Sequence, residues 1–120
     1  MSETTNILEQ NLLQIWNQRN YVERNKIMKK LYSPECIFYE SDNSNGIIGI
    51  EAINDYIEAL QKNWQPEFSF EIDLPGVINH EVARVSWKLG IPDVSIVAKG
   101  TDIAYIENGL IRKLFLFLNR

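Results

Sequence analysis

The stretch AKGTDIAYIENGLIRKLFLFL, residues 98–118, predicts two β-strands joined by a two-residue turn. Asn108-Gly109 is a strong hairpin signal, because a type I′ turn needs positive φ angles at both central residues. The turn pairs Glu107 with Leu110 and so predicts the register of the whole hairpin. On one face, the predicted pairs are Ile106 with Ile111, Ala104 with Lys113, Asp102 with Phe115, and Gly100 with Phe117.

Both faces of this hairpin are mostly apolar. The predicted pairs on the second face are Ile103 with Leu114, Thr101 with Leu116, Lys99 with Leu118, and Tyr105 with Arg112. An antiparallel sheet usually leaves one face polar, so both faces here need a cover. We expect helices on one face and a second copy of the sheet on the other, which predicts a homodimer.

The rest of the chain predicts an α+β layer fold. Apolar residues at helical spacing predict helices over residues 5–18, between Asn20 and Ser33-Pro34, and over residues 51–64. Strands follow the period-two alternation. They are predicted at ECIFYE (35–40), FSFEID (68–73), VINHEVARVSWKL (77–89), VSIVAKGTDIAYIE (94–107) and LIRKLFLFL (110–118), with turns at LPG, GIPD and NG. Helices first and antiparallel strands after them indicate one domain over residues 1–120.

The strand before the hairpin is expected to bring Trp87 to the face of Asp102. A GIPD loop pairs Leu89 with Val94, Trp87 with Ile96, Glu81 with Asp102 and Arg84 with Lys99. Two of these pairs oppose like charges, so a register slipped by two fits equally well. In either register Trp87, Asp102, Phe115 and Phe117 share a face, unless Gly100 marks a bulge that turns Asp102 over.

In these registers Asp102 lies among apolar side chains, so it has either a chemical or a structural role. A carboxylate against two Phe rings loses hydration, which raises its pKa, whereas Lys113 on the diagonal would lower it. A carboxyl group with a pKa near neutrality can transfer a proton at pH 7. Alternatively, Asp102 has a purely structural role and is hydrogen-bonded to Thr101, to backbone or to Tyr side chains.

Composition narrows the classes of partner. The chain has 120 residues, 45% of them hydrophobic, which suits one domain with one core. A net charge of −4 argues against nucleic acid, because phosphate binding needs a concentrated basic face. Lys26, Lys29 and Lys30 end a predicted helix, where cations complement the helix dipole.

Targeting, metal and cofactor signals are weak throughout the sequence. The start, MSETTNILEQ, has no basic segment followed by an apolar one, and no stretch has the roughly 18 apolar residues of a membrane span. We therefore expect a cytoplasmic protein without a membrane partner. One cysteine, Cys36, and one histidine, His80, do not make a zinc site, so no metal is expected. No Gly-rich loop follows a strand and opens a helix, so no cofactor is expected.

The order of these elements resembles the nuclear-transport-factor-2-like (NTF2-like) superfamily and its SnoaL-like, ketosteroid-isomerase-like branch. The segments that carry the resemblance are Trp16, YSPECIFYE (32–40), GIEAINDYIEAL (49–60), VARVSWKLG (82–90) and GTDIAYIENGLIRKLFLFL (100–118). The resemblance implies a strongly curved mixed or antiparallel sheet that three helices wrap into a cone with an apolar pocket. It also implies a dimer through the outer face of the sheet. The pocket walls would be Trp16, Trp64, Val85, Trp87, Phe115 and Phe117.

Three functions are compatible with this resemblance. One is a cofactor-independent isomerase, cyclase, hydrolase or dehydratase, with Asp102 as general acid or base and Tyr21, Tyr32 or Glu40 as polar partners. No set of residues here reproduces the ketosteroid-isomerase pattern of an Asp base with a Tyr and a protonated Asp. The second function is binding of a small apolar ligand without chemistry, and the third is plain dimerisation. An enzyme needs at least two convergent polar groups in the cavity, a binding protein needs one anchor, and a dimerisation module needs no cavity.

Overall fold

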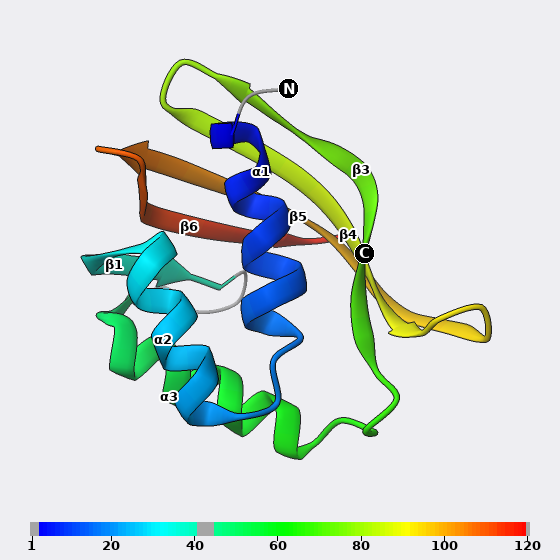
Figure 1. Cartoon of the computed structure of the whole chain (residues 1–120). Helices are drawn as coiled ribbons and strands as arrows, with labels where there is room; N and C mark the ends of the chain where they lie inside the picture. The colour runs from blue at the N-terminus through cyan, green and yellow to red at the C-terminus, as the bar shows by residue number, and fades with distance from the viewer. Residues whose placement is uncertain (1–2, 41–44, 120) are drawn as a thin grey trace.

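The computed structural model describes residues 3–40 and 45–119. Its helices are α1 (Glu3–Gln10), η1 (Asn11–Trp16), α2 (Tyr21–Leu31) and α3 (Ile50–Lys62). Its strands are β1 (Tyr32–Tyr39), β2 (Ile47–Ile48), β3 (Ser69–Asn79), β4 (Val82–Ile91), β5 (Ser95–Glu107) and β6 (Leu110–Leu118). The helices lie against one side of the sheet, and the β4–β5 hairpin projects beyond them (Figure 1).

The strands form one mixed sheet in the order β2-β1-β6-β5-β4-β3. β1 and β6 are parallel, and all other neighbours are antiparallel. Irregular pairing in β3, between β4 and β5, and between β5 and β6 accompanies the curvature of the sheet, because an extra residue bends and twists a strand. The predicted α+β class with helices on a curved sheet is therefore confirmed (Figure 1).

The first helix differs from the single helix predicted over residues 5–18. After α1 the backbone widens into the π-helix η1, and the N–H of Asn17 donates to the carbonyl of Leu12, five residues back, at 3.2 Å. The wider turn directs Asn11, Leu12, Ile15 and Trp16 inward, whereas Leu13 is 46% exposed. A polar side chain, Asn11, thereby enters the core.

The predicted turn at residues 74–76 is wrong. β3 continues through these residues with register shifts on both sides of Leu74, and the hairpin turns at His80 and Glu81 instead. Pro75 is tolerated because β3 is an edge strand. The backbone N–H of Gly76 donates to the Glu9 carboxylate at 2.8 Å. A side chain of α1 therefore provides a hydrogen-bond acceptor for this irregular segment of β3.

The hairpin register predicted from Asn108-Gly109 is correct only for its first two pairs. Beyond Ile106 and Ile111 the pairs are Tyr105–Lys113, Ala104–Leu114, Ile103–Phe115, Asp102–Leu116, Thr101–Phe117 and Gly100–Leu118. Arg112 is the extra residue, and its guanidinium donates to the Glu35 carbonyl at 2.7 Å, where the pairing of β1 with β6 is also irregular. The bulge turns every later residue of β6 to the opposite face.

The predicted β4–β5 register, and its alternative slipped by two, are also wrong. Trp87 pairs with Gly100 and Val85 with Asp102, four residues along β5 from the first prediction. A register shift by an even number of residues leaves each side chain on the same face of the sheet, so Trp87 and Asp102 share a face as expected. Pairing is regular at Gly100; the extra residue is Val97.

A buried arginine fixes α2 and α3 relative to η1. The Arg24 side chain is fully buried and donates to the Asn54 side chain at 2.6 Å and to the Gln18 carbonyl at 2.8 and 3.0 Å. It also pairs with Glu58 at 3.2 Å. This network joins α3 to α2 and to the segment after η1, and a cavity lies between α3 and the sheet.

Candidate functional site

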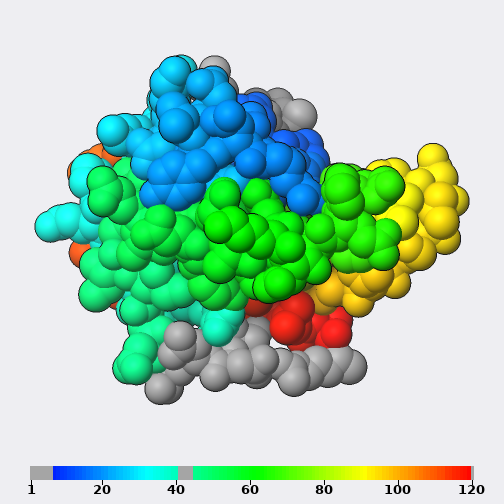
Figure 2. Space-filling view, turned by 90° about the horizontal axis from the view of Figure 1, so that it is seen from below, coloured from blue at the N-terminus to red at the C-terminus, as the bar shows by residue number. Residues whose placement is uncertain are grey.

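An aromatic cavity of about 160 Å³ lies between η1, α3 and the inner face of the sheet. Its lining residues are Trp16, Phe38, Glu40, Tyr56, Leu60, Trp64, Phe70, Trp87, Leu89, Ala98, Leu116 and Leu118. In Figure 2 the end of β6, in red, emerges beside the green segment that contains α3. Strand β6 and helix α3 thus provide opposite walls of one cavity.

Six aromatic side chains dominate the lining and pack against one another. Trp16 contacts Phe38 with ring centroids 5.4 Å apart and Phe70 at 6.1 Å. Phe70 also contacts Trp64 at 5.7 Å and Trp87 at 5.1 Å. Most of these contacts are edge-to-face, an arrangement that aromatic quadrupoles favour. The rings support one another through these contacts.

Two polar side chains meet at this cavity. Glu40 follows β1 and Tyr56 lies on α3, and the Tyr56 hydroxyl donates a hydrogen bond to the Glu40 carboxylate. Helical spacing puts Tyr56 on the same face as the buried Ile53 and Ile57, which aims its ring at the sheet. A carboxylate and a phenol therefore converge on an otherwise apolar space.

Asp102 lies behind the cavity wall rather than in the lining. Its side chain is 3% exposed, and its Oδ1 accepts a hydrogen bond from Nε1 of Trp87 at 2.9 Å. Gly100 makes this geometry possible: a Cβ there would lie 2.4 Å from Cζ2 of Trp87. The indole thus occupies the space above Gly100, with one part toward the cavity and its N–H toward Asp102.

Burial raises the pKa of Asp102 to about 7, and the hydrogen bond from Trp87 opposes that rise. The expected influence of Lys113 is absent, because the bulge at Arg112 places Lys113 opposite Tyr105, on the outer face. Asp102 is desolvated as expected, but Phe115 and Phe117 are not the residues that desolvate it. The register brings Val85 and Leu116 beside Asp102 instead.

A second buried polar cluster lies on the helical side. The Tyr32 hydroxyl donates to Oδ1 of Asn11 at 2.5 Å and accepts from Nε1 of Trp16 at 3.3 Å. Burial raises the pKa of Tyr32 well above its usual value. Nδ2 of Asn11 has no hydrogen-bond partner among the described residues.

The structure brings together only some of the candidate residues. Glu40 lines the cavity, whereas Tyr32 and Asp102 are buried outside its lining. The Tyr21 hydroxyl bonds to Asp55 at 2.7 Å on the exposed surface between α2 and α3. Cys36 is buried, which raises the pKa of its thiol to about 12.

Of the expected pocket walls, Trp16, Trp64 and Trp87 line the cavity. Val85 packs in the core beside Asp102. Phe115 and Phe117 lie on the outer face, where Phe115 stacks on Tyr39 with centroids 4.9 Å apart. The bulge at Arg112 is the reason, because it replaces these rings by Leu116 and Leu118 on the inner face.

Sequence reasoning missed Tyr56 as a polar partner. The helical spacing over residues 51–64 places Tyr56 on the buried face of that helix, together with Ile53, Ile57 and Leu60, and names no partner for it. The available signal was the hydroxyl itself, because it is the only polar group among those apolar positions and needs a partner when buried.

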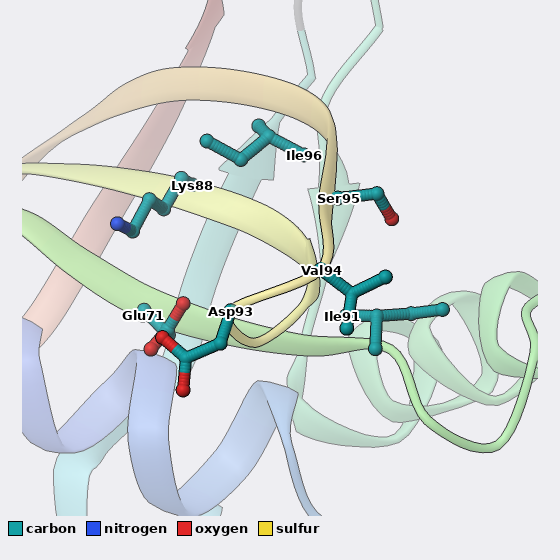
Figure 3. A pocket seen from close by; sticks show the side chains of 7 residues that line it. All are labelled: Glu71, Lys88, Ile91, Asp93, Val94, Ser95 and Ile96. Carbon is teal, nitrogen blue, oxygen red and sulfur yellow. The ribbon is translucent and has the colours of Figure 1, made fainter.

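A larger hollow of about 350 Å³ lies at the tip of the β4–β5 hairpin (Figure 3). Its lining residues are Glu71, Lys88, Ile91, Asp93, Val94, Ser95 and Ile96. It carries charges of both signs and exposed aliphatic side chains, including Val94 and Ile96. We regard the smaller aromatic cavity as the candidate site, because ligand sites are concave and mostly apolar with a few convergent polar groups.

Among residues 3–40 and 45–119, no group of three or more His, Cys, Asp and Glu side chains could hold a metal ion. No helix in the same ranges has both the length and the apolar character needed to cross a bilayer.

No protein-family model matches the sequence, and no curated protein matches it either. Solved structures are similar in fold. A candidate isomerase of the SnoaL-like family from Agrobacterium tumefaciens superposes with a TM-score of 0.86 at 22% identity, over 99% of this chain and 100% of that one. A candidate SnoaL-like polyketide cyclase from Jannaschia sp. CCS1 gives 0.78 at 12% identity, over 97% and 85%. A de novo designed protein with a curved β-sheet gives 0.73 at 15% identity, over 99% and 88%.

The chain therefore has the SnoaL-like, NTF2-like fold, and the resemblance found in the sequence is confirmed at the level of the fold. The same fold occurs in the designed protein, so the fold by itself assigns no activity. The function has to be argued from the cavity.

Proposed function

We propose that the protein binds a small apolar molecule in the aromatic cavity. The observation that carries this proposal is a space lined by six aromatic rings and several aliphatic side chains, with one carboxylate–phenol pair at its wall among the described residues. Such a space is costly to leave empty, because its lining loses dispersion contacts. A ligand that fills it recovers them.

The volume limits the ligand to about the size of one ring. An apolar cavity of about 150 Å³ in another protein holds benzene, and this one measures about 160 Å³. Toluene, cyclohexane derivatives and short branched chains fit within that limit. A fused polycyclic molecule exceeds it unless the walls move.

Tryptophan fluorescence can test this proposal directly, because all three tryptophans of the chain line the cavity. Titration with toluene is expected to change the emission and to saturate. The variant Ala98→Leu fills part of the cavity and is expected to abolish the change. Its control, Val97→Leu, adds a methylene group at the exposed neighbouring residue and keeps the change. An unsaturable response, or one unaffected by Ala98→Leu, would contradict the proposal.

A second candidate function is cofactor-independent acid–base catalysis on such a ligand. The convergence of Glu40 and Tyr56 favours it, because a carboxylate can remove a proton next to a carbonyl, and the Tyr56 hydroxyl could turn from Glu40 to donate its one proton to the carbonyl oxygen. Asp102 would act behind Trp87, as support for the wall, unless the indole swings aside.

Exchange of the α-protons of cyclohexanone in D₂O, followed by NMR, tests this second function. Catalysis predicts faster exchange with the wild-type protein and loss of that acceleration in Glu40→Gln. Equal exchange with and without protein would leave binding as the function.

We also propose that a second copy of the chain covers the outer face of the sheet. This face carries Tyr39, Ile103, Tyr105, Phe115 and Phe117, and Phe117 is 52% exposed. An exposed apolar face of this kind is typical of a self-association surface. Phe117→Lys is expected to convert a dimer to a monomer in sedimentation velocity runs, and a wild-type protein that sediments as a monomer would refute the proposal.

A further inference from the structure

We propose that the aromatic cavity selects an organic cation, namely a small aryl or cycloalkyl amine whose ammonium group pairs with Glu40. This inference rests on the proposed ligand-binding function and specifies the charge of the ligand. The juxtaposition that carries it is one carboxylate set into a cage of six aromatic rings.

The charge in the described lining of the cavity favours a cation. Glu40 is the only charged residue in the lining, which contains no Lys, Arg or His among the described residues. Another acid, Asp102, lies behind the wall and accepts a hydrogen bond from Trp87. Arg19 lies 6.0 Å from the Trp64 ring centroid, but its guanidinium donates to the carbonyls of Gln65 and Phe68 at 3.1 and 2.9 Å. That arginine is held by the backbone and is not part of the lining.

The aromatic rings add to this preference. The face of an aromatic ring is electronegative, and cages of such rings bind ammonium groups through cation–π contacts. Trp16, Trp64 and Trp87 are the best ring type for this interaction. The apolar body of an amine fills the same cavity, so the two contributions act together.

Tyr56 orients the carboxylate for this role. Its hydroxyl donates to Glu40 from α3. An ionised carboxylate accepts about four hydrogen bonds, so one phenol leaves acceptor capacity for an ammonium group. An anionic ligand of the same size would instead face Glu40 at short range without a compensating cation, which costs free energy in an apolar space.

Ligands of matched size separate charge from shape. Toluene, benzyl alcohol, benzylamine and benzoate share one ring and differ in the charge and polarity of one substituent. Binding is measured at pH 7 by tryptophan emission and by ligand-observed NMR. We expect benzylamine to bind about tenfold more tightly than benzyl alcohol, which corresponds to about 1.4 kcal/mol, and benzoate to bind most weakly.

The matched variants are Glu40→Gln and Glu51→Gln. Glu40→Gln is expected to reduce the preference for benzylamine over benzyl alcohol to about onefold while toluene still binds, which shows that the cavity is intact. Glu51 is an exposed residue of α3, so Glu51→Gln makes the same change in net charge away from the cavity and should leave the preference unchanged.

Three results would overturn the inference. They are benzoate binding at least as tightly as benzylamine, an unchanged preference in Glu40→Gln, and an equal loss of preference in Glu51→Gln. If toluene and benzyl alcohol bind but benzylamine has no advantage, the cation preference fails and the proposed function stands. If none of the four ligands binds, the proposed function fails with it.

Discussion

The indole Nε1 of Trp87 donates a hydrogen bond of 2.9 Å to Oδ1 of Asp102, and this bond joins the cavity wall to a carboxyl group in the core. Trp87 lies on β4 opposite Gly100 of β5, and Asp102 lies on β5 opposite Val85 of β4. The absence of a Cβ at Gly100 lets the indole cross to the neighbouring strand. The state of Asp102 and the position of the wall are therefore linked.

The first prediction concerns the pH dependence of stability. The pKa of Asp102 is about 7 in the folded protein and about 3.8 in the unfolded chain. Between these values the folded state binds more protons, so this group makes the free energy of unfolding decrease as the pH rises from about 4 to about 7. The decrease attributable to Asp102 has an upper limit of about 4 kcal/mol. Urea unfolding at pH 5 and pH 8 measures the part of this decrease that falls between those pH values, at most about 2.7 kcal/mol.

Asp102→Asn is the control for this prediction, since it keeps the acceptor for Trp87 and removes the titration. The variant should lose less stability than the wild type between pH 5 and pH 8. If both proteins show the same difference, Asp102 does not hold its proton near neutrality.

The second prediction concerns the same carboxyl group after removal of its donor. Trp87→Phe deletes the N–H that lowers the pKa of Asp102, so the pKa is expected to rise above about 7. Carboxyl-carbon NMR titration measures the change. Trp64→Phe also replaces a tryptophan of the cavity but touches no donor to Asp102, and should leave that pKa unchanged. An unchanged or lower pKa in Trp87→Phe would contradict the assignment of the hydrogen bond.

The third prediction tests the fit of Trp87 over Gly100. Gly100→Ala places a methyl group against the indole and the Phe117 carbonyl, so we expect a loss of about 2 kcal/mol or more in the free energy of unfolding. A smaller ring should relieve part of the clash. In a double-mutant cycle with Trp87→Phe, the alanine should cost less than it does alone. Additive losses would show that the two sites do not interact.

The fourth prediction concerns the buried arginine. Arg24→Met leaves Glu58 and the side chains of Asn54 and Gln61 without their cationic partner, so the free energy of unfolding should fall by about 3–5 kcal/mol. Lys26→Met on the same helix removes an exposed pair with Glu23 and should cost less than about 1 kcal/mol. Thermal or urea unfolding compares the two variants, and similar losses in both would refute the structural role given to Arg24.

The helical half of the fold was predictable because its apolar residues repeat at the helical period. The sheet was less so. Residues 114–118 carry apolar side chains on both faces, so periodicity cannot report a bulge at Arg112. The register predicted from the Asn108-Gly109 turn is therefore off by one residue from Lys113 onward. The segment at residues 74–76 contains Pro and Gly, yet it lies on an edge strand, where both are tolerated without a turn.

The candidate site was predictable in part. Trp87 and Asp102 share a face because an even register shift preserves alternation, so their proximity could be foreseen. The Trp87 indole lies over Gly100 and separates Asp102 from the cavity. The sequence pattern does not show how a side chain of that volume packs. The meeting of Glu40 and Tyr56 depends on where α3 packs on β1, a tertiary contact without a local sequence signal.

The parallel pairing of β1 with β6 has a consequence for the order of folding. Tyr39 and Phe115 are neighbours in the sheet although most of the chain separates them, and closing so long a loop costs entropy. The hairpins of β3–β6 close much shorter loops. Strand β1 should therefore dock last, onto a meander that has already formed. Pulsed hydrogen exchange during refolding is expected to protect the amides of β4 and β5 before those of β1, so the aromatic cavity would close only in the final kinetic step.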